Sequence, residues 1–209
     1  MKYSYLLHAE VYLNGLFKIQ KKKANFQEIA DTFGTFDQQA VNHFILSKHW
    51  NYESLMYDVA QSSNTLFQEL SVAQDVGTAL LVDEVSFRKK GKYSACVERQ
   101  YLGSLGKVDN GQVAVCLALS KGSIFSPINL KLFMPESWEE DHEKRHRCHI
   151  PKEEKHVPKP KMALDMIQEA KNRRIQFDFV NFDSLYGSSY ESLLESFAKP
   201  PFVKRVKYG

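Results

Sequence analysis

The chain has 209 residues, a formal net charge of +3 and a hydrophobic content of 43%, which suits one or two folded domains with sizeable cores. This mildly basic charge is compatible with nucleic-acid binding but does not by itself indicate it. The three cysteines, Cys96, Cys116 and Cys148, form no C-x-x-C pair, which argues against a disulfide framework and for a reducing compartment.

The N-terminal sequence lacks the pattern of a signal peptide, because polar residues interrupt its apolar positions and no small-residue cleavage site follows. No stretch approaches the roughly 18 apolar residues that a membrane-spanning helix needs. A cytoplasmic protein without a membrane partner is therefore expected.

Residues 1–75 carry apolar side chains at helical spacing in successive short segments. In one of them the apolar positions lie at i, i+3, i+4 and i+7 from Phe26, and Gly34 follows as a C-cap residue. Thr35 or Asp37 can cap the next helix. Short helices joined at a glycine resemble a helix-turn-helix, which would bind DNA, whereas a plain helical bundle would not. The periodicity leaves both interpretations open.

The pattern changes to strands near Gly77, so residues 76–209 are predicted to form a second region. An apolar run, Ala79 to Val82, predicts a buried strand and ends on two acids, Asp83 and Glu84. A carboxylate at the exit of a buried strand is accessible to a metal or a substrate. Because strand side chains alternate between faces, the two acids are not expected to serve the same site.

Four cationic side chains follow the acids at once: Arg88, Lys89, Lys90 and Lys92. A basic loop beside an acid on a rigid strand predicts a site for a polyanion. Such residues could lie along a DNA backbone and give salt-dependent affinity without sequence information. The alternative is an ordinary solvated loop.

Further strands and one helix are expected downstream. Asp109-Asn110-Gly111 predicts a tight hairpin turn, because Asn-Gly supplies the positive φ angles that such a turn needs. Apolar strands are predicted at Val113 to Leu119 and at Ile128 to Met134. Prolines and dense charge then predict a loop-rich segment from Pro135 to Pro160, and Lys161 to Arg174 follows as an amphipathic helix.

Two weaker patterns do not predict sites. Gly103 and Gly106-Lys107 hint at a phosphate loop, but the P-loop spacing and the following Ser or Thr are absent, so a turn is predicted. His142 and His146 have i, i+4 spacing but lie in a run of charges without a second cysteine pair, so zinc is not predicted.

A fourth strand, Phe177 to Phe182, ends on Asp183, and a further strand begins at Phe202. If the first and fourth strands are neighbours, Asp83 and Asp183 meet at one edge of the sheet. Ribonuclease-H-like nucleases use this arrangement, in which such acids hold Mg²⁺ or Mn²⁺.

The order and spacing of several segments together resemble an insertion-sequence transposase of the DDE type, in the group of DDE superfamily endonucleases. The matching segments are HFILSKHWN, VDEVSFRKKGKYSACVERQYLGSLGKVDNGQVAVCLAL, LFMPESW, IPKE, KMALDMI and FVNFDSLYG. The resemblance runs from Tyr12 to Val206 and implies an α/β (α+β) fold. It implies a helical, DNA-binding region over residues 1–75. Residues 76–209 would form a ribonuclease-H-like mixed sheet with flanking helices, incomplete at its C-terminus.

The resemblance also implies metal-dependent cleavage and strand transfer at the ends of a mobile element. Asp83 matches the first catalytic acid and Asp183, in the D-x-x-Y-G pattern, the second. Both would be metal ligands in a site for two Mg²⁺ or Mn²⁺ ions, with Asp83 bridging the ions and Asp183 binding one. The implied partners are double-stranded DNA at the element ends and target, and a second copy of the chain on DNA. A bacterial-type, nucleoid-associated location follows.

The third acid of the family pattern, a glutamate, comes well after the strand that begins at Phe202. The expectation is therefore a fragment with little or no activity alone. Glu191 and Glu195 are candidates to replace it, but their spacing better suits a solvated helix face. The alternative hypothesis is a non-catalytic DNA-binding remnant or regulator derived from a transposase. A different ribonuclease-H-like nuclease, such as a resolvase, agrees less well with the order of the motifs.

Overall fold

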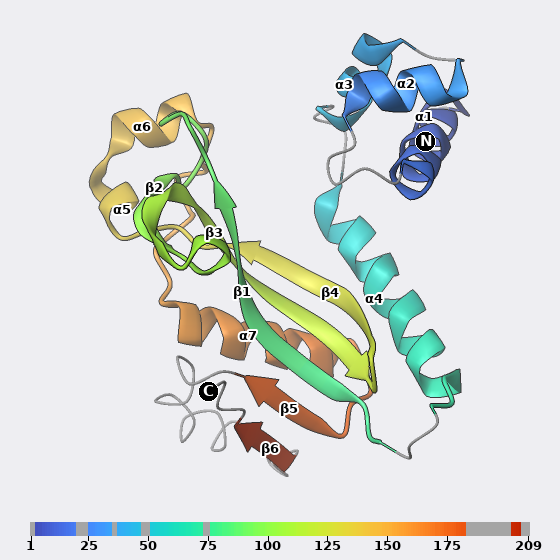
Figure 1. Cartoon of the computed structure of the whole chain (residues 1–209). Coiled ribbons are helices and arrows are strands. Elements are labelled where there is room, and N and C mark those ends of the chain that lie inside the picture. The colour runs from blue at the N-terminus through green and yellow to red at the C-terminus, as the bar shows by residue number, and fades with distance from the viewer. Residues whose placement is uncertain are drawn as a thin grey trace. The chain divides into compact units, whose positions relative to one another are not determined.

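The computed structural model describes residues 3–19, 25–34, 37–46, 51–72, 76–182 and 202–205. The chain forms two compact units that divide between Tyr52 and Glu53 (Figure 1). Among the described helices, none combines the length and apolar character that crossing a bilayer requires.

In its described residues the first unit contains three helices: α1 (Tyr3–Lys18), α2 (Phe26–Phe33) and α3 (Gln38–Ile45). The ends of α2 and α3 follow the capping signals of the sequence. The predicted C-cap at Gly34 is confirmed, with φ 62° in the left-handed region that glycine adopts without strain. Asp37 caps α3 by accepting a hydrogen bond from the backbone N–H of Ala40 at 2.7 Å. Asn25 caps α2 in the same way, through the backbone N–H of Glu28.

One buried residue from each helix forms the core of this unit: Val11, Ile29 and Val41. Gly15 lets α1 approach α2 closely, because a Cβ at this position would lie 2.7 Å from a side-chain carbon of Ile29. The unit is thus a small helical bundle. DNA binding by its helices stays a prediction.

The fourth helix, α4 (Tyr52–Glu69), belongs almost wholly to the second unit, although the sequence grouped it with the helices before residue 75. Its buried polar residues find their partners there. The Ser63 hydroxyl lies 2.8 Å from that of Ser126, and the backbone N–H of Gln176 donates to Asn64 at 2.7 Å. Apolar periodicity alone could not show which core the helix would cover.

The second unit is built on a mixed sheet, to which the described residues contribute six strands: β1 (Ala79–Arg88), β2 (Glu98–Leu102), β3 (Lys107–Lys121), β4 (Ile124–Leu132), β5 (Phe179–Phe182) and β6 (Phe202–Arg205). The strand order is β2-β3-β1-β5-β6, and β4 also pairs with β3. β3 runs antiparallel to β1, whereas β5 is parallel to β1 and to β6. With its flanking helices, this mixed sheet confirms the predicted fold class.

The helix α7 (Lys159–Asn172) makes the crossover that a parallel strand requires, and Figure 1 shows it behind the sheet. The core of the unit lies between this helix and one face of the sheet. It contains alternate residues of the central strands and the apolar side of α7: Leu80, Val82, Leu117, Leu119, Val180, Phe182, Met166 and Ile167. The next residue after Val82 therefore points to the opposite face.

The predicted hairpin turn at Asp109-Asn110-Gly111 is wrong, because these residues run through β3 and pair with β2. The turn between β2 and β3 lies instead at the short 3-10 helix η1 (Gly103–Leu105) and Gly106, where the sequence also predicted a turn. Gly106 has φ 63°, so the positive φ angle comes from this glycine.

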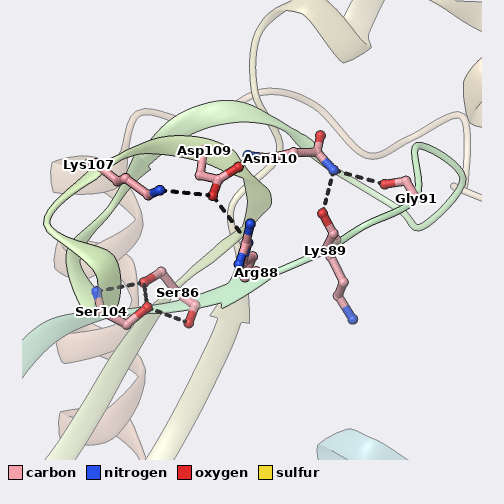
Figure 2. Close-up of polar contacts among 8 residues, drawn as sticks. All are labelled: Ser86, Arg88, Lys89, Gly91, Ser104, Lys107, Asp109 and Asn110. Atoms are coloured by element: carbon pink, nitrogen blue, oxygen red, sulfur yellow. Dashed lines mark hydrogen bonds and ion pairs between the residues drawn. The ribbon is translucent and has the colours of Figure 1, made fainter.

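Asn110 and Gly111 have another role, which tertiary structure imposes. The side-chain amide of Asn110 donates to the backbone carbonyls of Lys89 at 2.7 Å and Gly91 at 3.0 Å (Figure 2). Gly111 lies against β1, where a Cβ would come within 2.6 Å of the backbone oxygen of Phe87. The Asn-Gly pair therefore does not form a turn here. Instead, Asn110 binds the loop after β1, and Gly111 allows β3 to approach β1 closely.

The predicted loop-rich segment contains two short helices, α5 (Ser137–Glu140) and α6 (His142–Arg147). They are too short to show an apolar period. Arg145 holds them instead: its side chain is buried, and its guanidinium donates to the backbone carbonyls of Pro151 and Glu154, each at 2.7 Å. Hydrogen bonds to several carbonyls let the charge be buried without a carboxylate partner.

We expect Gly111→Ala to destabilise the protein by about 1–3 kcal/mol, because the added methyl group would force β1 and β3 apart. The matched control is Gly103→Ala, where the space around an added Cβ is open. Thermal melting should show a Tm lowered by several degrees for the first variant and unchanged or slightly raised for the second. Equal Tm values would contradict the close approach of the strands.

Glu169 on α7 joins the helix to β4 through Lys131 at 3.0 Å and Asn129 at 3.3 Å, and it also pairs with Arg173. Burial alone would raise the pKa of Glu169, but the hydrogen bond and charge of Lys131, with Arg173 and Asn129, lower it overall. A lowered pKa stabilises the folded state above the ordinary carboxyl pKa, and this contribution is lost as the pH falls through the folded value.

Glu169→Gln should therefore lower the urea midpoint more at pH 7 than at an acid pH below the folded pKa, where the wild-type carboxyl has taken up its proton. Asp165→Asn, which removes an exposed ion pair with Lys161 on the same helix, is the control and should change little at either pH. The same loss at both pH values would show that the charge of Glu169 is not what joins α7 to the sheet.

Candidate metal-binding site on the central strand

The sequence predicted that the first strand ends at the two acids, which is wrong, because β1 runs on to Arg88. Asp83 lies within this strand, on the face of the sheet opposite α7 and directly after the buried residue Val82. Its carboxylate is exposed, and one oxygen accepts a hydrogen bond at 2.7 Å from the backbone N–H of Glu84. Within the described part of the chain it has no cationic partner. The strand therefore presents an accessible, negatively charged oxygen donor from a rigid position.

Glu84 points to the other face, as the alternation predicts, and is neutralised there. Its carboxylate lies 2.7 Å from the ammonium of Lys159, the first residue of α7, and both side chains are only about one fifth exposed. The same ammonium lies 5.0 Å from the ring centroid of Phe133. Glu84 thus joins β1 to α7 and does not share a site with Asp83.

Asp183, the second predicted ligand, lies outside the described residues. The strand before it is described, and its register is informative. β1 and β5 are parallel neighbours, which meets the condition that the sequence left open, and Val82 and Phe182 are direct Cα partners. Each is followed in the chain by one of the two acids, Asp83 and Asp183. The position of Asp183 itself stays a prediction.

Asn181 was not identified from the sequence. Its partner on β1 is Leu81, so by strand alternation its side chain lies on the same face as Asp83. The carbonyl oxygen of this side chain is buried, and no described residue donates a hydrogen bond to it. A buried oxygen without a donor beside an exposed carboxylate fits a hard divalent ion, which takes carboxylate and carbonyl ligands.

Cys116 was also missed, because its register opposite Asp83 cannot be known from sequence alone. Burial raises the pKa of the Cys116 thiol, and the negative charge of Asp83 raises it further. The thiol therefore stays protonated at neutral pH and adds no charge to the site. Within the described residues, no group of three or more His, Cys, Asp or Glu side chains could hold a metal ion.

The four basic residues after Asp83 in the chain, Arg88, Lys89, Lys90 and Lys92, differ in the contacts that they make. Arg88 pairs with Asp109 at 3.1 Å, and Lys107 approaches the same carboxylate at 3.8 Å (Figure 2). The hydrogen bond from the backbone N–H of Asn110, with the charge of Arg88, lowers the pKa of Asp109 and keeps it ionised. Lys89 has its carbonyl bound by Asn110, as described above.

Lys90 and Lys92 are exposed, and neither has an acidic partner among the described residues. These charges do not surround Asp83. At about 3.4 Å per residue, Arg88 lies about 17 Å along β1 from the carboxylate. The basic segment is therefore placed to contact a long ligand at some distance from the acid.

A double-mutant cycle on Glu84→Gln and Lys159→Met should give a coupling of about 1–3 kcal/mol, because each single change leaves a half-buried charge without its nearest partner. Urea unfolding of the four proteins measures it. The equivalent cycle on the exposed pair of Lys161 and Asp165 should give about 0.5 kcal/mol or less. A similar coupling in both cycles would contradict a structural role for the Glu84 pair.

Comparison with known proteins places the chain in a family. Residues 5–195 match the family described as DDE superfamily endonuclease. The chain therefore belongs to this family, as its motifs predicted, and both Asp83 and Asp183 fall within the matched region.

One relative is the "Probable transposase for insertion sequence element IS701" from Microchaete diplosiphon, which is 30% identical over 175 residues. The match covers 83% of this chain but only 41% of that transposase. Two solved structures are similar at lower levels. The Mos1 strand transfer complex has 10% identity and a TM-score of 0.29, covering 96% of this chain and 57% of that one. The Mos1 paired-end complex with the left transposon end has 12% identity and a TM-score of 0.27, covering 93% and 58%.

Proposed function

We propose that this chain carries the first two acids of an insertion-sequence transposase, and that Asp83 and Asp183 hold divalent metal for cleavage and strand transfer at element ends. The register of β1 and β5 carries the proposal, since it makes Val82 and Phe182 partners immediately before the two acids. The family match and the transposase relative support the same activity.

In this proposal, one set of residues binds the metal ion and another contacts the DNA backbone. Asp83 provides a carboxylate held by the backbone N–H of Glu84, and Asn181 provides a carbonyl oxygen on the same face. Mg²⁺ or Mn²⁺ bound there would act as a Lewis acid on the phosphodiester and lower the pKa of a water molecule. Lys90 and Lys92 would contact phosphates of double-stranded DNA away from the reacting bond.

Other parts of the proposal follow from the family alone. The helical unit of residues 3–46 would contribute further DNA contacts, and two copies would assemble on paired element ends, in the nucleoid. The chain spans 41% of the transposase that it matches, so the activity belongs to the whole protein and has to be tested there.

Calorimetric titration with Mn²⁺ is the first test, because it reports on the ligands without needing turnover. We expect Asp83→Asn and Asp183→Asn each to weaken binding by about a hundredfold, since each removes a charged ligand. The control is the double variant Glu84→Gln/Lys159→Met, which keeps the net charge and should bind Mn²⁺ as the wild type does. Wild-type affinity in Asp83→Asn would exclude the site.

Mn²⁺-dependent nicking of supercoiled DNA that carries element ends is the second measurement, made on the whole protein. It should disappear with either aspartate variant and persist in the control. Binding of DNA without any binding of Mn²⁺ would instead support the alternative, a non-catalytic DNA-binding remnant.

A further inference from the structure

The loop after β1 and the segment with α5 and α6 form a small module with a core of its own. Cys96 from the loop packs with Met134 and Trp138, and all three are buried. In Figure 1 this loop lies beside α6 at the end of β1 far from α4. Neither the proposed metal site nor the core under α7 explains why the loop is held here.

Several hydrogen bonds fix the loop. Asn110 binds the carbonyls of Lys89 and Gly91, and the side chain of Gln112 donates to the carbonyl of Ala95 at 2.6 Å. The thiol of Cys148 donates to the carbonyl of Tyr93 at 3.3 Å. Bonds on both sides of residue 93 and at the residue itself hold this part of the backbone in one conformation.

On this fixed backbone Tyr93 is 69% exposed. The guanidinium of Arg147, from α6, lies over its ring at 4.6 Å from the centroid. Among the described residues, Arg147 pairs with one carboxylate, that of Glu143, at 3.8 Å on the exposed helix surface. The planar guanidinium of Arg147 covers part of the Tyr93 ring, and most of the side chain of Tyr93 stays open to solvent. The two planar groups together can therefore stack with a third.

Two further positive charges lie close to Tyr93 in the sequence. Lys90 and Lys92 precede Tyr93 in the loop, and neither has an acidic partner in the described residues. Duplex phosphates would interact with these charges but would not use the ring. A base outside a duplex would use both, because bases of any identity stack on an aromatic side chain while the basic groups hold the strand.

We propose that Tyr93 and Arg147 form a stacking platform for an unpaired DNA base, with Lys90 and Lys92 holding the adjoining phosphates. The proposal rests on the proposed function in that its ligand is the DNA on which the metal site would act. β1 fixes the spacing: Arg88 lies about 17 Å from Asp83, which is about five base steps of 3.4 Å. The loop that carries Tyr93 begins at this end of β1, so the platform and Asp83 would engage different parts of the same DNA.

The test is fluorescence anisotropy with a labelled duplex and with the same duplex carrying a three-nucleotide unpaired gap. Tyr93→Ala should weaken binding to the gapped DNA by about five- to a hundredfold and change binding to the intact duplex less than about twofold. Tyr93→Phe keeps the ring and should bind both as the wild type does. Tyr101→Ala is the matched control, since Tyr101 is 61% exposed on β2 and should leave both affinities unchanged.

A second variant and a second readout separate stacking from charge and from folding. Arg147→Lys keeps the positive charge but loses the planar group, so it should weaken gapped binding by about two- to fivefold. 2-Aminopurine in the gap should be quenched by the wild type and Tyr93→Phe and remain bright with Tyr93→Ala. Circular dichroism and melting of each variant show that the module is folded.

Equal weakening of gapped and intact DNA by Tyr93→Ala, or no weakening of either, would overturn the platform. If the wild type bound Mn²⁺ and duplex DNA in that case, the proposed function would stand and only the platform would fail. If the wild type bound neither, the proposed function would fail first.

Discussion

The parallel pairing of β1 with β5 is the contact on which the rest of the second unit depends. It joins strands whose acids lie far apart in the sequence, and it places Val82 opposite Phe182. A parallel neighbour cannot be reached by a tight turn, so the chain needs the crossover through α7. Burial of α7 on the sheet then stabilises both the pairing and the core. The candidate metal site is thus a consequence of how the core forms.

Strand alternation gives two adjacent acids opposite functions. Glu84 points toward α7, where water is scarce, and the ammonium of Lys159 compensates its charge. Asp83 points away and keeps its charge accessible. The pair joins the strand to the helix one residue beyond the exposed carboxylate. Two adjacent residues therefore differ in role: Glu84 stabilises the packing of β1 on α7, and Asp83 presents an accessible carboxylate.

The sequence was informative where local physics decides. Apolar runs ended at Asp83 and before Asp183, and Gly34 and Asp37 capped helices as predicted, because capping depends on neighbours a few residues away. It failed where distant groups decide. Asn110 and Gly111 carry a strong turn signal, yet contacts with the loop and with β1 override it. The roles of residues beside Asp83 depend on strand register, which no local pattern contains.

The course that β3 takes in place of the predicted hairpin also connects Asp83 with the basic loop after β1. Had the chain turned at Asn110, that amide would face solvent and the basic loop would lack its main anchor. Instead β3 continues, pairs with β1 as far as Arg88, and holds the loop at a set distance from Asp83. A rigid strand between Asp83 and the loop keeps the separation of the carboxylate from the start of the loop constant. A flexible connection would bind the same groups but would not select that separation.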